Sequence, residues 1–365
     1  MNKIEYCIDE KQYFCYNDSY KKAYFVNFYH KKECSMEQKQ KILYLEIIRI
    51  LAIFSVILLH CNAEYFSDGK IFETKTWWLS NTINAASRFG VPVFFMISGF
   101  VLLSTKTAEN MTLFYKKRFL KIIPAFLAWN LIYYINHCFK QGTFFSVKEF
   151  ITLFGTQNIS YHFWFVYMIL FFYLFTPFLK KVVNQCTQKQ LWICFLIIIF
   201  PTTICPLLNR MLGKWFLYFP MTVEGYWGYF LMGYLLGNYQ TPKKYRMILY
   251  CLAILCVPIA IIGTHNGSSF EKIDTFYSGG YQFNSFVIGA AIFLFFKYHM
   301  PVIKSTVLSK YIVMFGNLSF GLYLCHVLLI EKLHLFFDFS KTYVQIFVLT
   351  FLTFIIGYMI IFFIH

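Results

Sequence analysis

Charged side chains are scarce in this sequence. Asp, Glu, Lys and Arg make up 14% of the 365 residues, whereas 58% of the residues are hydrophobic. A soluble domain carries about 25% charged residues, so these are too few to cover an ordinary water-facing surface. The scarcity excludes a soluble enzyme, and an aromatic content of 22% with a mean hydropathy of +0.54 excludes a disordered or fibrous protein. A polytopic membrane protein remains.

Acidic residues are scarcer than basic ones. The chain has 17 Asp and Glu against 33 Lys and Arg, which gives a net charge of +16. In a soluble protein this excess would suggest nucleic acid as a partner. In a membrane protein it is expected, because cytoplasmic loops collect Lys and Arg. We therefore predict a lipid bilayer, and no nucleic acid, as the surroundings of this chain.

Paired cysteines are also missing. The chain has eleven cysteines, an odd number, and none of them forms a CxxC pair. Most lie inside apolar runs, where cysteine acts as a small apolar residue. The sequence therefore predicts neither a disulfide framework nor a metal site.

Apolar runs long enough to cross a bilayer follow one another from residue 42 to the end of the chain. Before them, residues 1–41 are polar and mixed in charge, and we expect a cytoplasmic extension there, followed by one membrane domain over residues 42–365. The predicted fold class is an all-α polytopic membrane protein, a bundle of about ten transmembrane helices. The expected spans are 42–61, 83–103, 119–136, 162–179, 190–208, 217–237, 246–263, 282–298, 311–331 and 343–364.

The basic residues predict the orientation of these spans. With the N-terminus inside, the inner segments hold 22 of the 33 cations and the outer segments hold ten. The remaining cation, Arg49, lies within the first span. Because cytoplasmic segments are the more basic ones, we expect a plasma-membrane protein with both termini in the cytoplasm.

The first expected span carries three ionisable residues, Glu46, Arg49 and His60. Eleven positions separate Arg49 from His60, which is three helical turns plus about 20°, so the two side chains share a face about 16 Å apart along the axis. Ionisable groups inside an apolar span are functional candidates. Arg49 is placed to bind an anion and His60 to transfer a proton. Two plainer interpretations stay open: a Glu46–Arg49 ion pair that only orients the helix, and a hydrogen bond from His60 that only aids packing.

A second basic cluster, YKKRFLKIIPAF, opens the third span. Arg118 and Lys121 are i, i+3 neighbours at the expected N-terminal end of that helix, where free N–H groups and the helix dipole favour anions. A cytoplasmic ligand that carries phosphate would fit there. The alternative is a basic loop that only sets topology, and for Lys116 and Lys117 this alternative is favoured.

Taken together, these motifs resemble the acyltransferase-3 family of integral membrane O-acyltransferases. The resemblance rests on Arg49-x10-His60, FFMISGF, the R-x-x-K pair, HFWFVY and SFGLYLCH, and it covers residues 42 to about 364. It implies transfer of an acyl group, usually acetyl, from acyl-CoA in the cytoplasm to a hydroxyl of a cell-envelope glycan or glycolipid outside. It also implies that His60 is the catalytic histidine and Arg49 its partner cation. Arg118 and Lys121 would hold the donor, although Lys121 stands where the family has arginine and lacks the planar fork of a guanidinium.

Two other functions compete with acyl transfer. A transporter or flippase for a glycan precursor would show internal repeats, broken helices and several intramembrane carboxylates, whereas only Glu46 and Glu224 qualify here. A membrane sensor without catalysis is the third reading. Under the enzymatic reading, His60 acts either as general base on the acceptor hydroxyl or as a transient acyl carrier.

Overall fold

The computed structural model describes residues 28–105, 110–213, 225–280, 282–303, 305–336 and 342–364, and among them every regular element is a helix. Short 3-10 helices lie at Gly69–Ile71 (η1), Tyr161–Phe163 (η3) and Phe276–Ser278 (η5), and one π-helical stretch lies at Phe200–Ile204 (η4). The α-helices are α1 Phe28–Ser67, α2 Lys75–Ser87, α3 Gly90–Ser104, α4 Met111–Gln141, α5 Val147–Gly155, α6 Trp164–Gln185, α7 Gln188–Ile199, α8 Cys205–Leu212, α9 Tyr226–Asn238, α10 Lys243–Gly267, α11 Phe283–His299, α12 Thr306–Phe336 and α13 Thr342–Ile364.

These helices confirm the predicted fold class. Within the described ranges, nine helical segments are long and apolar enough to cross a membrane, and they correspond to nine of the ten expected spans. The remaining expected span, 217–237, begins among residues that the structure does not describe. Its described part is α9, which has 13 residues and lies in the middle of the bundle.

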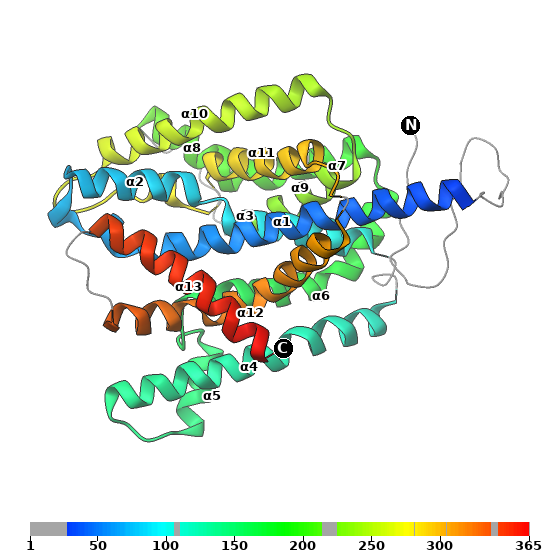
Figure 1. Ribbon diagram of the computed structural model, residues 1–365. Coiled ribbons are helices and arrows are strands. Elements are labelled where there is room, and N and C mark those ends of the chain that lie inside the picture. The colour runs from blue at the N-terminus through cyan, green and yellow to red at the C-terminus, as the bar shows by residue number, and fades with distance from the viewer. Residues whose placement is uncertain are drawn as a thin grey trace.

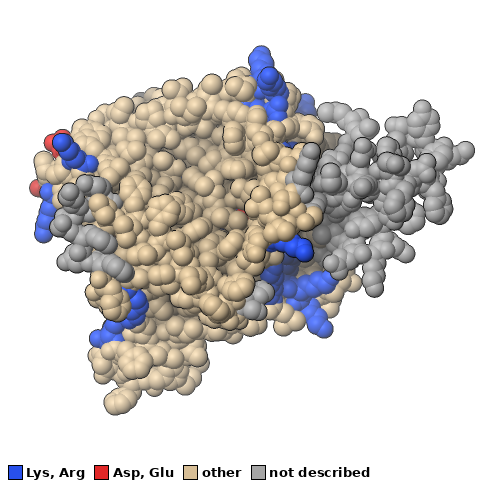
Figure 2. Space-filling view, viewed as in Figure 1, with Lys and Arg blue, Asp and Glu red and all other residues tan. Residues whose placement is uncertain are grey.

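The helices run side by side along one direction (Figure 1). Helix α1 passes through the middle and packs against α2, α3, α11, α12 and α13. Viewed from the same side, Lys, Arg, Asp and Glu gather at the two ends, and the middle of the face is almost free of them (Figure 2). An uncharged band between two charged ends is the surface expected of a protein that crosses a bilayer.

Helices α3 and α9 approach each other closely at two glycines. A Cβ atom built on Gly99 would lie 1.8 Å from the carbonyl oxygen of Phe230, and one built on Gly233 would lie 1.9 Å from that of Met96. Small residues at a helix interface allow this approach in membranes. Gly99, in the FFMISGF segment of the sequence, is therefore a point of close packing between α3 and α9.

Polar contacts at one end of the bundle join segments that the cation count places outside. Lys140 Nζ lies 2.8 Å from Glu331 Oε2, and His265 Nε2 lies 3.2 Å from Glu73 Oε1. At the opposite end, Lys297 Nζ donates to the Leu236 carbonyl at 2.7 Å. Each contact joins two segments assigned to the same side, so the predicted alternation of loops is consistent with the structure.

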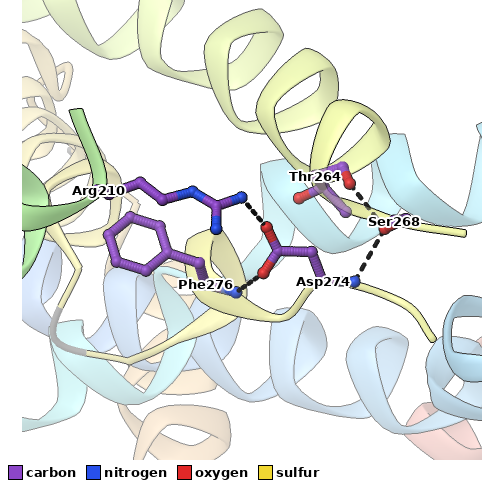
Figure 3. Close-up of polar contacts among 5 residues, drawn as sticks. All are labelled: Arg210, Thr264, Ser268, Asp274 and Phe276. Carbon is purple, nitrogen blue, oxygen red and sulfur yellow. Dashed lines mark hydrogen bonds and ion pairs between the residues drawn. The ribbon is translucent and has the colours of Figure 1, made fainter. Parts of the chain in front are cut away.

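A further contact of this kind fixes the loop between α10 and η5 (Figure 3). The guanidinium of Arg210, at the end of α8, donates to one carboxylate oxygen of Asp274. The other oxygen accepts from the backbone N–H of Phe276 at 2.9 Å, and Ser268 Oγ accepts from the N–H of Asp274 at 2.8 Å. Ser268 Oγ in turn donates to the carbonyl of Thr264 at 2.6 Å, so the loop is tied to both α8 and α10.

Residues 28–41, part of the expected N-terminal extension, are helical and continuous with the first span in α1. One expectation from the sequence needs correction. Arg88 was counted with the outer segment 62–88, although the expected span 83–103 contains it, and it lies inside the candidate span Lys75–Ser104, between α2 and α3. The expected span began only at residue 83 because the buried residues of α2 include four polar ones, Ser80, Asn81, Asn84 and Ser87, which lower the hydropathy of the segment. The side-chain amides of Asn81 and Asn84 donate to the Ile261 carbonyl and to Ser278 Oγ, so polar groups of α2 find partners inside the protein.

The close approach of α3 and α9 predicts a large effect for one added methyl group. Gly233→Ala forces a carbon into the backbone of α3, and we expect a loss of about 1–3 kcal/mol of stability or more. Gly155→Ala is the matched control, because nothing lies within 4 Å of a Cβ there. Thermal unfolding of the purified variants in detergent measures both effects. Equal melting temperatures for the two variants would contradict the packing described here.

Candidate active site

The site is built on one face of α1. Arg49 Nη1 lies 2.6 Å from Glu46 Oε1, so the predicted i, i+3 ion pair is present. Arg49 keeps 25% of its side-chain surface exposed, whereas Glu46 is buried. The pair neutralises part of the charge of Arg49 and leaves the guanidinium accessible.

Arg118 and Lys121 of α4 lie near this pair. The charges of Arg49, Arg118 and Glu46 all act on Lys121, and the buried Tyr173 of α6 is close to both arginines. Arg49, Arg118 and Lys121 therefore lie within electrostatic range of one another, and we call these three residues the cationic cluster.

Arg118 and Lys121 do not lie at the N-terminal end of their helix, and that prediction from the sequence was wrong. Helix α4 begins at Met111, where the Asn110 side chain caps it by accepting from the N–H of Leu113. Arg118 and Lys121 thus lie about two and three turns inside the helix. Free N–H groups and the helix dipole act only within the first turn. The attraction of this site for anions must therefore come from its three side-chain charges.

Two other helical segments meet α1 at His60. Tyr161 Oη of η3 lies 3.1 Å from His60 Nδ1, and the ring of His326 from α12 lies 5.0 Å from the imidazole, centroid to centroid. Tyr161 is 64% exposed, His60 is partly exposed and His326 is fully buried. His60 therefore faces an open side through Tyr161 and a packed side through His326.

The orientation of the His326 ring is fixed by its own helix. Nδ1 lies 2.6 Å from the carbonyl oxygen of Tyr323. Because a carbonyl only accepts hydrogen bonds, Nδ1 carries the proton and Nε2 is the acceptor nitrogen of the neutral ring. Among the described residues Nε2 has no hydrogen-bond partner.

A third histidine completes this group. The ring of His162 in η3 lies 4.9 Å from that of His326, and its Nδ1 lies 2.8 Å from Ser160 Oγ. The Tyr323 hydroxyl donates to the His162 carbonyl and ties η3 to α12. His162 begins the HFWFVY segment and His326 ends SFGLYLCH, and only the tertiary structure brings these two segments to His60. We call the three histidines and Tyr161 the histidine cluster.

The two clusters differ in the chemistry they can support. The cationic cluster can hold a polyanion, and the histidine cluster can accept and return a proton. Three imidazoles meet here, yet within the described ranges no group of three His, Cys, Asp or Glu side chains is placed to hold a metal ion. Glu224, the other intramembrane carboxylate noted in the sequence, lies outside the described residues.

An apolar cavity of about 630 Å³ lies along α6, which contributes six of its eight lining residues. Its lining runs from Gln157 and Trp164, beside η3, to Phe119 and Leu174, near the cationic cluster. Most of these side chains are apolar, so the cavity suits a hydrocarbon chain better than a sugar or a phosphate.

Comparison with known proteins identifies one matching family. The family model described as "Acyltransferase domain", that of the acyltransferase-3 family, matches residues 42–362. No curated protein and no solved structure matches the chain. The match includes every residue of both clusters and nearly the whole membrane region. The chain therefore belongs to the acyltransferase-3 family and is a multi-pass membrane protein with an acyltransferase domain.

Proposed function

We propose that the protein is an O-acyltransferase of the plasma membrane. It moves an acyl group, acetyl by the family resemblance, from acyl-CoA at the cytoplasmic face to a hydroxyl of a glycan or glycolipid outside. The observation that carries this proposal is the arrangement of α1, which contributes Arg49 to the cationic cluster and His60 to the histidine cluster. The two residues are eleven positions apart, or about 16 Å along the axis.

The cationic cluster suits the phosphates of coenzyme A. Arg49 and Arg118 offer guanidinium groups, which bind phosphate through paired N–H groups, and Lys121 adds a point charge. The phosphates and the thioester lie at opposite ends of coenzyme A, joined by the pantetheine arm. Phosphates held at this cluster would allow the thioester to extend toward His60 along the same face of α1.

The histidine cluster suits activation of a hydroxyl. We assign the Nδ1 proton of His60 to a hydrogen bond with Tyr161 Oη, which leaves Nε2 free to accept the proton of the acceptor hydroxyl. The acceptor oxygen then bonds to the carbonyl carbon, and when the carbon–sulfur bond breaks, the thiolate takes the proton back from His60. In the other mechanism the imidazole attacks the thioester first and carries the acyl group briefly.

The apolar cavity on α6 favours a lipid-linked acceptor. It begins beside η3, whose Tyr161 Oη lies 3.1 Å from His60 Nδ1. A lipid tail in this cavity would hold the sugar headgroup near the histidine cluster, and its burial would supply binding energy without a contact to the sugar.

The first test measures release of coenzyme A thiol from acetyl-CoA by the purified protein in detergent with an envelope glycolipid extract. We expect thiol release by the wild type and a rate about 10²–10⁴ lower for His60→Ala, the usual effect of losing a general base. His299→Ala is the control, because this exposed imidazole lies on α11 outside the histidine cluster. Thiol release by well-folded His60→Ala at the wild-type rate would contradict the mechanism. No release by the wild type would reject the proposed activity itself.

Tyr161→Phe should have a smaller effect. It removes the hydroxyl 3.1 Å from His60 Nδ1 and keeps the ring, so only the orientation of the imidazole is lost. A neutral hydrogen bond contributes about 0.5–1.5 kcal/mol, which predicts a roughly 2- to 13-fold lower kcat with little change in donor KM. Steady-state kinetics with acetyl-CoA measures this, with Tyr311→Phe on the exposed surface of α12 as control. An unchanged kcat would show that Tyr161 does not orient His60.

Arg118→Ala should mainly raise the donor KM, because it removes a binding contact remote from the reacting carbonyl. A charge-assisted contact is worth about 1.5–3 kcal/mol, and partial exposure favours the lower end, or roughly tenfold in affinity. Lys121→Ala should cost less and Lys121→Arg should be tolerated. All three effects should shrink at high salt.

The matched control for these variants is Lys117→Ala, whose exposed side chain belongs to the same basic segment. Its donor KM should equal that of the wild type at both salt concentrations. If Arg118→Ala behaves like Lys117→Ala, the basic segment only sets topology and the donor is held elsewhere.

A further inference from the structure

Arg88 is a cation within the membrane-spanning part of the protein, and the mechanism above does not use it. It lies between α2 and α3, and among the described residues no carboxylate forms an ion pair with it. Its Nε donates to Asn84 Oδ1 at 3.0 Å, and Nη2 donates to the same oxygen. An arginine has five N–H groups, so these contacts leave three of them for another acceptor. A charge at this depth is costly and is a functional candidate by default.

Two hydrogen bonds set the depth of Arg88 relative to His60. Ser55 Oγ of α1 donates to the Ser87 carbonyl of α2, and Asn62 Nδ2 donates to the Ser80 carbonyl at 2.9 Å. The two helices are thus antiparallel, and Asn84 lies opposite the turn of α1 that precedes His60. The guanidinium is held at Asn84, and side chains of a helix lean toward its N-terminus. The head groups of Arg88 and His60 therefore lie at the same depth.

The packing of α3 places the junction between α2 and α3 beside the turn of α1 that precedes His60. A Cβ atom on Gly90 would lie 2.8 Å from the Ala52 carbonyl oxygen, 2.9 Å from Val56 Cγ2 and 3.0 Å from Ser55 Oγ. Val56 and His60 are i, i+4 neighbours on one face of the helix, whereas Ser55 lies on another. The junction thus lies next to the face of α1 that carries His60. In agreement, the charge of Arg88 acts on the imidazole of His60.

Both head groups remain reachable. Arg88 and His60 keep part of their surface exposed, whereas Asn84, Ser87 and Gly90 around the junction are buried. A carbonyl group bound between the two residues would meet guanidinium N–H groups that have no acceptor among the described residues.

We propose that Arg88 binds the carbonyl oxygen of the thioester and stabilises its negative charge in the transition state. This inference rests on the proposed function. As the acceptor oxygen bonds to the carbonyl carbon, its proton moves to His60 Nε2 and the π electrons move to the carbonyl oxygen, which Arg88 holds. When the carbonyl re-forms, the carbon–sulfur bond breaks and the thiolate takes the proton from His60. A fixed cation in a water-poor site is especially effective for this purpose.

The experiment measures kcat and donor KM for acetyl-CoA with the full-length protein and the envelope glycolipid extract. Loss of one oxyanion donor lowers kcat by about 10²–10³, so we expect this for Arg88→Gln with donor KM within about twofold of wild type. Arg88→Lys should retain more activity, and added guanidinium at low concentration should partly restore Arg88→Gly. Arg210→Gln is the control, because its guanidinium binds Asp274 at the end of the bundle.

A structural role would give a different pattern. If Arg88 only clamps α2 through Asn84, each variant would lose melting temperature and active protein in proportion, and guanidinium would restore nothing. That result, or a wild-type kcat for Arg88→Gln, overturns the inference while the wild type still transfers the acyl group. A wild type that releases no thiol overturns the proposed function and this inference together.

Discussion

An ionisable side chain within an apolar membrane span must find a polar neighbour, and the centre of this protein is organised by that requirement. Glu46 lies against Arg49, Asn84 accepts from Arg88, and the Tyr323 carbonyl accepts from His326. Each contact satisfies its group only in part: Arg49 and Arg88 stay partly exposed, and Nε2 of His326 has no partner among the described residues. Groups held in place but not saturated are suited to bind a ligand.

The sequence predicted the features that depend only on residues of the same helix. The all-α bundle followed from apolar runs, and the Glu46–Arg49 pair followed from their spacing in α1. The same periodicity placed Arg49 and His60 on one face, and their neighbours agree, since both residues approach the side of α1 occupied by α4, η3, α6 and α12. A spacing within one helix needs no knowledge of tertiary structure.

What the sequence could not supply was the set of groups brought to α1 by other helices. His162 and His326 lie more than a hundred positions from His60, and nothing local indicates that they meet it. Arg88 was counted with the outer segment before the second span for another reason. The buried polar residues of α2 lowered its hydropathy, so its first two turns were taken for a loop, although the Asn81 and Asn84 side chains donate hydrogen bonds inside the protein. The boundary of α4 shows the same limit: its cap at Asn110 lies eight residues before Arg118, beyond the reach of the helix dipole.

The arrangement of the two clusters also bears on how a group would cross the membrane. A transporter exposes one site to each side in turn and needs parts that move against one another. Here Arg49 and His60 belong to one continuous helix, so the distance between the clusters is fixed by the pitch of α1. The close backbone contacts of Gly99 and Gly233 likewise join α3 to α9 with little freedom to slide. Under the proposed function, the long pantetheine arm of the donor would span the fixed distance and the acyl group alone would be passed on. A bundle with two polar clusters at a fixed separation fits transfer of an acyl group by a long donor better than it fits alternating access.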